Sequence, residues 1–171
     1  MHPRAEEFAA RARERYGFDP DVREFPEGTK TAADAAEAIG CEVGAIASSL
    51  VFRLEGLDRA TADRLEGLDP DRPLVVAVTS GANRVDESRL AAHFGADGAT
   101  MADADEIRSV LGWSIGGVPP FCHETAVPVV SDQSLDDYDE LWAAAGTPAA
   151  VFPITPAELR ELSGAEPIAV A

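Results

Sequence analysis

The sequence predicts a single domain of the α/β (or α+β) class, in which helices pack on a mixed β-sheet. Segments with helix start and stop signals alternate with short apolar segments typical of strands. The chain has 171 residues, close to the usual size of one domain, and 46% of them are hydrophobic, which is enough to form a core. A polar stretch between two apolar strand segments favours some antiparallel pairing. We therefore expect residues 1–171 to form one domain.

Six helices are predicted from their boundary residues. Thr31, Asp86 and Asp103 have side chains that can accept hydrogen bonds from a first helical turn. Glycine follows most of these segments and forms a left-handed C-terminal cap without strain. The predicted helices cover residues 3–16 (within an N-terminal segment 1–17), 31–39, 86–94, 103–111, 136–145 and 155–163.

Seven short apolar segments are predicted to be strands. They cover residues 22–25, 45–54, 74–79, 99–101, 126–130, 149–154 and 167–170. The segment 74–79 is apolar throughout rather than alternating, which is typical of a central strand buried on both faces.

One hexapeptide occurs twice between the second and third of these strands. The sequence Arg-Leu-Glu-Gly-Leu-Asp at 53–58 recurs at 64–69. Two copies are too few for a solenoid, which needs at least three repeats. We interpret residues 53–73 as a duplicated, polar hairpin extension without a direct role in function.

The chain is strongly acidic. Its formal net charge is −17, from 31 acidic and 14 basic residues, and Lys30 is its only lysine. The acidic residues are spread along the whole chain, which is not the pattern of an acidic tail. Such a charge is tolerated where salt screens it, so we infer a salt-rich cytoplasm; an ordinary acidic enzyme is the alternative. Nonspecific binding to DNA is disfavoured, because it needs a basic surface.

No membrane, secretion or cofactor signal is present. The longest uncharged apolar run, 73–79, is far shorter than the ~20 residues of a membrane helix, and the first fifteen residues have no apolar signal-peptide core. A cytoplasmic location follows. The sequence has no GxGxxG or Walker motif for a nucleotide cofactor and no GxSxG elbow, so no cofactor is expected.

The cysteines and histidines indicate neither disulfides nor a metal site. Cys41 and Cys122 are too few for a disulfide framework and are expected to be reduced thiols. The histidines His2, His93 and His123 lie far apart without ligand spacing, and two of them, near helical or charged segments, are interpreted as surface residues. Cys122 and His123 are adjacent on a predicted extended segment, where neighbouring side chains point apart, so a Cys–His dyad is disfavoured.

A loop rich in glycine and proline, residues 112–121, is the strongest candidate for chemistry. Glycines Gly116 and Gly117 allow close backbone approach to a ligand, and the pair Pro119 and Pro120 stiffens the segment. An array of backbone N–H groups held in this way can stabilise the oxyanion formed during ester cleavage. A rigid connector without a ligand is the alternative.

Seven segments, in order and spacing, resemble the YbaK/ProX family, the prolyl-tRNA-synthetase-associated editing domains. The resemblance covers roughly residues 20–168, and the order of the segments makes it specific although no single segment is. The segments are 31–40, 46–52, 74–81, 84–86, 116–121, 131–135 and 142–146.

The resemblance implies a mixed sheet wrapped into a partial barrel and an aminoacyl-tRNA deacylase activity. The reaction would hydrolyse the ester between a mischarged small amino acid, such as Ala or Cys, and the tRNA 3′ end. A GxxP loop, matched by residues 117–120, would hold the carbonyl, and water or a substrate hydroxyl would be the nucleophile. Aminoacyl-tRNA is then the expected partner, and an aminoacyl-tRNA synthetase is left open as a second.

The resemblance also assigns residues to the substrate pocket. Phe25 matches an aromatic position, Ser49 a small hydroxyl position and Asp132 an acidic position, while Lys30 and Thr31 belong to a region that lines the pocket in relatives. Each of the first three also has a purely structural interpretation: Phe25 as a core residue, Ser49 as a strand residue and Asp132 as a turn residue.

Ser48 is the main departure from the family pattern. The family has a lysine at this position, thought to contact the terminal phosphate and to be needed for deacylation. Because charge-assisted hydrogen bonds are about twice as strong as neutral ones, its loss could cost ~2–3 kcal/mol, or about 30- to 150-fold in rate. Lys30, Arg53 and Arg84 are possible substitutes. A catalytically silent member that binds aminoacyl-tRNA or a nucleotide, and a hydrolase of unrelated esters, remain as alternatives.

Overall fold

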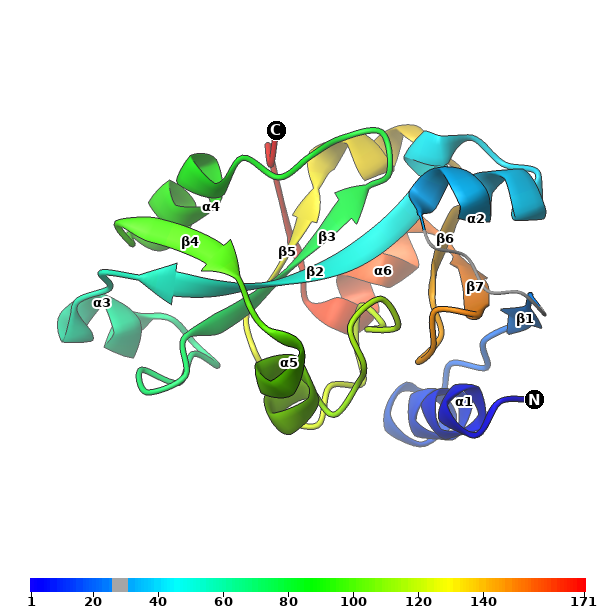
Figure 1. Cartoon of the computed structure of the whole chain (residues 1–171), viewed down its shortest axis with the longest axis horizontal. Coiled ribbons are helices and arrows are strands. Elements are labelled where there is room, and N and C mark those ends of the chain that lie inside the picture. Colours follow the sequence, from blue (N-terminus) through cyan, green and yellow to red (C-terminus); the bar gives the residue numbers. More distant parts are fainter. Residues whose placement is uncertain (26–30) are drawn as a thin grey trace.

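A mixed sheet of eight strands organises the chain (Figure 1). This computed structural model describes residues 1–25 and 31–171. The α-helices are α1 (Pro3–Tyr16), α2 (Ala32–Ile39), α3 (Arg59–Arg64), α4 (Glu87–Phe94), α5 (Ala104–Leu111) and α6 (Pro156–Ser163). The strands are β1 (Arg23–Glu24), β2 (Ile46–Glu55), β3 (Leu74–Ser80), β4 (Gly98–Met101), β5 (Val129–Asp132), β6 (Leu141–Ala144), β7 (Ala150–Ile154) and β8 (Glu166–Ile168). Two 3₁₀ turns, η1 (Val43–Ala45) and η2 (Gln133–Asp137), complete the order.

The strand order is β1-β7-β6-β2-β3-β5-β8, with β4 pairing on β2 beside this path. The β2–β3, β2–β4, β6–β7 and β1–β7 pairs are antiparallel. The β2–β6, β3–β5 and β5–β8 pairs are parallel. The predicted fold class, a mixed sheet with flanking helices, is confirmed.

The long strand β2 carries two different strands along one of its edges. Near its start, Ile46 and Ala47 pair with β6, and near its end, Phe52–Glu55 pair with β4. Between these pairings, residues 48–51 have no strand beside them on this edge in the described part of the chain. In Figure 1, β2 crosses the molecule, with β4 along one end and β6 near the other. We call this interruption the β2 gap.

Local side-chain caps explain the starts of four of the six predicted helices. The hydroxyl of Thr31 accepts a hydrogen bond from Asp34 N, and the carboxylates of Asp86 and Asp103 cap α4 and α5 in the same way. Thr155 and Glu158 form a full capping box at α6. Each such cap contributes about 1 kcal/mol. These starts are therefore fixed by residues next to one another in sequence.

The core lies on both faces of the sheet. On one face Leu74, Val76 and Val78 of β3 join a cluster that includes Phe8 of α1 and Trp113. On the other face, Val75 and Ala77 pack with α4. All five of these β3 residues are fully buried, which confirms the prediction of a central strand at 74–79.

The predicted helix at 136–145 is wrong. Residues 133–137 form the 3₁₀ turn η2, and Leu141–Ala144 form strand β6. Leu141 and Ala143 enter one core cluster and Trp142 another, which is the alternation of a strand. Pairing with β2 and β7 outweighs the helix propensity of the alanines here.

The duplicated segment differs from the predicted hairpin extension. It does connect two antiparallel strands, but it contains a capped helix, α3, rather than two further strands. The first copy of the hexapeptide finishes β2, whereas the second begins at the end of α3. The two copies thus share a sequence without sharing a conformation, because only the first has a strand to pair with.

Two strand boundaries are also displaced. The strand predicted at 126–130 is β5 at Val129–Asp132, and the one predicted at 167–170 is β8 at Glu166–Ile168. Both are set by parallel pairing between β5 and its neighbours, which sequence patterns do not encode.

Candidate active site

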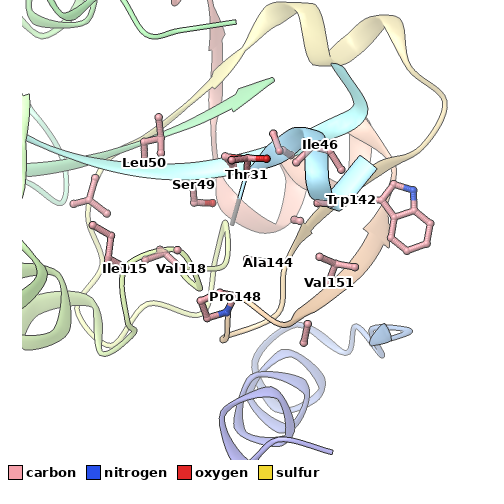
Figure 2. A pocket seen from close by; sticks show the side chains of 18 of the residues that line it. Thr31, Ile46, Ser49, Leu50, Ile115, Val118, Trp142, Ala144, Pro148 and Val151 are labelled. Carbon is pink, nitrogen blue, oxygen red and sulfur yellow. The ribbon is translucent and has the colours of Figure 1, made fainter. Parts of the chain in front are cut away.

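A cavity of about 480 Å³ opens at the β2 gap (Figure 2). Its walls come from four parts of the chain. They are the N-terminal turn of α2 (Thr31, Ala32, Ala35), β2 (Ile46–Val51), the glycine-proline loop with its neighbours (Met101, Ile107, Ile115, Gly116, Val118) and the β6–β7 hairpin (Trp142–Ala144, Pro148, Ala150, Val151). Segments far apart in sequence therefore meet where β2 lacks a partner strand.

The described walls of the cavity carry no charged side chain. Their only side-chain polar groups are the hydroxyls of Thr31, Ser48 and Ser49, apart from the indole N–H of Trp142. An uncharged cavity of this kind binds a ligand through shape, main-chain groups and a few hydroxyls. Among the described residues, no group of three or more histidine, cysteine or acidic side chains is arranged to hold a metal ion.

Ser49 supplies an unpartnered polar group. Its Oγ is buried and has no hydrogen-bond partner among the described residues. Figure 2 shows Ser49 on the cavity side of β2, with Leu50 on the opposite side. A buried hydroxyl without a partner costs about 1–3 kcal/mol, so a ligand that bonds to it regains this free energy.

Main-chain groups of β2 also face the gap. Leu54 N donates to Pro73 O on the β3 side, whereas Val51 O and Glu55 O accept from Ala102 and Asp97 on the other side. The odd-numbered residues of β2 therefore direct their N–H and C=O groups to the edge that β6 and β4 share. Ser49 lies between these two pairings, so its peptide groups border the cavity as well.

The glycine-proline loop forms the wall opposite β2. Gly116 has φ +84°, a conformation that favours glycine, and it lines the cavity together with Val118. Within the described residues, the N–H groups of Gly116 and Val118 have no acceptor in the protein. Both are therefore candidate backbone donors toward the cavity.

Gly117, the first residue of the GxxP segment, does not point its N–H toward the cavity. Its N–H donates to Ser114 O at 3.0 Å, and the residue does not line the cavity. A Cβ atom here would lie 2.7 Å from the Thr147 Cα. Gly117 is thus needed for close packing against the β6–β7 hairpin, and Pro120 is buried without reaching the cavity.

Three of the other residues assigned from the resemblance line the cavity, and Phe25 does not. Thr31, Ser48 and Ser49 line the cavity. Phe25 is half-buried and packs in the cluster that contains Trp142 and Val151, behind the cavity wall. Lys30 lies outside the described residues.

Asp132 is a structural residue at the end of β5. Its carboxylate accepts hydrogen bonds from Ser80 N, the Asn83 side chain and Ser134, and it is only 3% exposed. Burial opposes its ionisation, but the hydrogen bonds from Asn83, Ser134 and Ser80 outweigh burial and hold its pKa below the ordinary value. Asp132 does not line the cavity; it fixes η2 to the end of β3.

The arginines considered as substitutes for the family lysine do not reach the cavity. Arg53 is paired with Glu106, and Arg84 is exposed. Neither lines the cavity. The position of Ser48 thus has no cationic replacement among the described residues.

His123 is buried, unlike the surface position expected for two of the three histidines. It is only 8% exposed, and its Nε2 lies 2.8 Å from Pro119 O. Burial lowers the pKa of its imidazole. The neighbouring Cys122 thiol is also buried, which raises its pKa to about 11, so it stays protonated and unreactive at neutral pH. Only the tertiary packing of the loop reveals this burial.

The fold and cavity define a small α/β domain with a cavity at an interrupted strand edge, whose described walls carry no charged side chain. The chain belongs to the aminoacyl-tRNA editing domain family, whose model matches residues 26–162. The resemblance found in the sequence is thereby confirmed. Among the described residues, no helix has the length and apolar character needed to cross a membrane.

Individual relatives agree with this assignment. YwhH, an uncharacterised protein of Bacillus subtilis (strain 168), is 32% identical over 143 residues, which are 84% of this chain and 81% of that protein. The crystal structure of a candidate trans-editing enzyme for prolyl-tRNA synthetase is 35% identical, with a TM-score of 0.84, covering 99% of this chain and 98% of that chain. The hypothetical protein APE2540, 24% identical with a TM-score of 0.73 over 96% of each chain, shares the fold.

Proposed function

We propose that this protein is a trans-acting aminoacyl-tRNA deacylase that removes a mischarged small amino acid, of the size of Ala or Cys, from tRNA. The observation that carries the proposal is the cavity at the β2 gap, which is small, uncharged along its described walls and bordered by unpartnered hydrogen-bonding groups. Membership of the editing-domain family supplies the reaction class.

The walls of the cavity support a small substrate side chain. Ala32, Ala35, Ala47, Ala144 and Ala150 contribute only methyl groups to it. Such walls leave room for a short side chain and favour it through apolar contact.

Two sets of donors are proposed to hold the ester. The N–H groups of Gly116 and Val118 on the loop are proposed to bind the carbonyl oxygen and its developing negative charge. The Ser49 hydroxyl, on the opposite wall, is proposed to bond to a polar atom of the aminoacyl group.

The nucleophile is proposed to be water or a substrate hydroxyl. The described walls contain no cysteine, histidine or carboxylate that could attack or accept a proton. In the hydrolytic form, the water oxygen bonds to the carbonyl carbon while the bond from this carbon to the ribose oxygen breaks. The ribose oxygen takes one hydrogen of the water, and the new carboxylic acid loses its proton to solvent. The protein then acts by holding the ester and stabilising the oxyanion.

A deacylation assay at high salt tests the proposal. The protein is incubated with tRNAs charged with Ala, Cys or Ser, and release of the amino acid is compared with the uncatalysed rate. We expect release from at least one of the three. Hydrolysis at the uncatalysed rate on all of them would exclude the deacylase function for these substrates.

A pair of matched variants links the activity to the cavity. Ala144→Leu adds bulk inside it, whereas Ala33→Leu makes the same change at an exposed position on α2 that does not line it. We expect Ala144→Leu to abolish most turnover and Ala33→Leu to retain it. Equal effects of the two changes on turnover would show that the activity does not depend on the cavity.

One observation favours a second function, that of a binding protein without catalysis. Ser48 stands where the family has its lysine, and no other cation lines the described part of the cavity. In that case, the protein would bind the deacylation-resistant analogue 3′-alanylamino-adenosine while releasing no amino acid from any charged tRNA.

A further inference from the structure

The glycine-proline loop is supported from behind by side chains that do not touch the cavity. His123 approaches the Pro119 carbonyl from within the loop, and three arginines of α1 approach the loop from outside. The residues of α1 precede the segment matched by the family model. This support is therefore a feature that the family assignment does not describe.

The His123 contact fixes the direction of its hydrogen bond. A carbonyl oxygen only accepts, so Nε2 must carry the hydrogen that is donated to Pro119 O over 2.8 Å. The ring is buried, which disfavours its charged form. A neutral imidazole thus closes residues 119–123 into a tight turn directly after the cavity wall.

The backbone at this turn is held in an uncommon conformation. Cys122 has φ +66°, which among the described residues is otherwise seen only at glycines. Its carbonyl accepts from the Trp113 indole at 3.0 Å, and the next carbonyl, that of His123, accepts from Arg15 at 3.0 Å. Such conformations persist when surrounding contacts over-determine them.

Helix α1 holds the other end of the same loop. The Arg4 guanidinium lies 4.3 Å from the Trp113 ring centroid and donates to Gly112 O, and Arg11 lies 5.2 Å from the same centroid. Trp113 is fully buried between α1 and the loop. Both ends of residues 112–123 are therefore tied to one helix.

We propose that His123 is a positioning residue, which together with Arg15 of α1 holds the loop so that Gly116 and Val118 face the substrate carbonyl. This inference rests on the proposed deacylase function. In this proposal the buried imidazole does not contact the substrate or the cavity. Its role is to keep the two backbone N–H groups oriented toward the carbonyl.

Kinetics of three variants test the role of His123. In His123→Leu the donor is lost, and we expect kcat to fall at least tenfold with KM within about twofold. In His123→Gln the side-chain amide can donate to Pro119 O, and we expect kcat to recover to within threefold of the natural protein. Leu90→Ala, a cavity-forming change in α4 on the other face of the sheet, controls for lost stability and should keep its kcat.

Amide hydrogen exchange gives a readout that does not depend on activity. The Gly117 N–H bonds to Ser114 O within the loop. We expect its protection to fall at least tenfold in His123→Leu and in Arg15→Met, but not in Leu90→Ala. Unchanged kcat and unchanged protection in His123→Leu would overturn the inference. Inactivity of the unaltered protein on every charged tRNA would instead refute the proposed function, and the exchange measurement would still decide the role of His123.

Discussion

Ser48 and Ser49 are neighbours on β2 that face opposite sides of the strand. Both border the cavity, but only Ser49 has a buried hydroxyl without a partner. Ser48 stands where the family resemblance expects a lysine. The two residues allow two tests. In one, a cation is introduced at Ser48; in the other, the hydroxyl of Ser49 is removed.

Restoring the cation is expected to raise activity. Ser48→Lys places an ammonium beside the cavity, where it can form a charge-assisted bond to the terminal phosphate. We expect kcat/KM to increase about 30- to 150-fold, which corresponds to ~2–3 kcal/mol. Ser48→Met, of similar length but uncharged, is the control, and an equal gain in that variant would contradict the electrostatic explanation.

Removing the Ser49 hydroxyl is expected to stabilise the free protein. Ser49→Ala removes a buried group that has no protein partner, so the free energy of unfolding should rise by about 1 kcal/mol and the Tm by about 2–4 °C. Ser80→Ala removes a buried hydroxyl that donates to Gly44 O at 2.7 Å, and it should lower the Tm. Thermal unfolding of both variants measures the signs, and a fall in Tm for Ser49→Ala would show that its hydroxyl is satisfied in the free protein.

Asp132 provides a stability test that depends on pH. Its folded-state pKa is lowered, so the stability it contributes is present above its unfolded pKa of about 3.9 and is lost as the pH falls through the folded value. We expect Asp132→Asn to unfold at a lower temperature than the natural protein at pH 7. The difference should shrink below about pH 4, and a constant difference across this range would contradict the role of the carboxylate.

At the scale of elements, the loop and the β6–β7 hairpin must fit closely. A side chain at Gly117 would collide with the Thr147 backbone, which cannot move aside like a flexible side chain. We expect Gly117→Ala to displace the loop, to lower the free energy of unfolding by about 1–3 kcal/mol and to abolish turnover. Deacylation rates and thermal unfolding measure the two effects.

Gly40→Ala is the matched control for this element. Gly40 also has no side chain, but it lies at the end of α2 with φ +86° and open space around its Cα. The change should cost only about 1 kcal/mol of backbone strain and leave turnover intact. Equal loss of activity in Gly117→Ala and Gly40→Ala would show that the loss does not arise from displacement of the loop.

The elements that sequence predicted well are those with local causes. The caps at Thr31, Asp86 and Thr155 act on residues within the same turn, so their helices were found. Strand β6 was missed because its conformation is set by pairing with β2 and β7, which are distant in sequence. The same reason applies to the hexapeptide repeat, whose two copies have different neighbours.

The candidate site was predicted in part, for comparable reasons. Thr31, Ser48, Ser49 and Gly116, which the sequence singled out, line one cavity. Gly117, which was expected to donate to the substrate carbonyl, instead donates its N–H to a carbonyl within the loop. The burial of His123 has no signal in the sequence, because it arises from contacts between the loop and α1.

At the scale of the whole molecule, the dominant feature is self-repulsion from a net charge of −17. Salt at 1 M reduces the Debye length from about 10 Å, at 0.1 M, to about 3 Å and should therefore stabilise the fold. If screening contributes about 2 kcal/mol, the Tm should rise by ~4–8 °C between 0.1 and 1 M KCl. Thermal unfolding in KCl measures this, and a Tm that is constant over this range would contradict adaptation to a salt-rich cytoplasm.

The interruption along β2 has a consequence for assembly. Exposed sheet edges recruit strands from other molecules and so promote aggregation. Residues 48–51 offer a length of only about 13 Å, at 3.3 Å per residue, which is shorter than the commonest strand length of about five or six residues. The flanking strands close this edge on both sides. The open edge is therefore no longer than the shorter strands of this sheet, and β4 and β6 on either side of it limit the approach of a neighbouring chain.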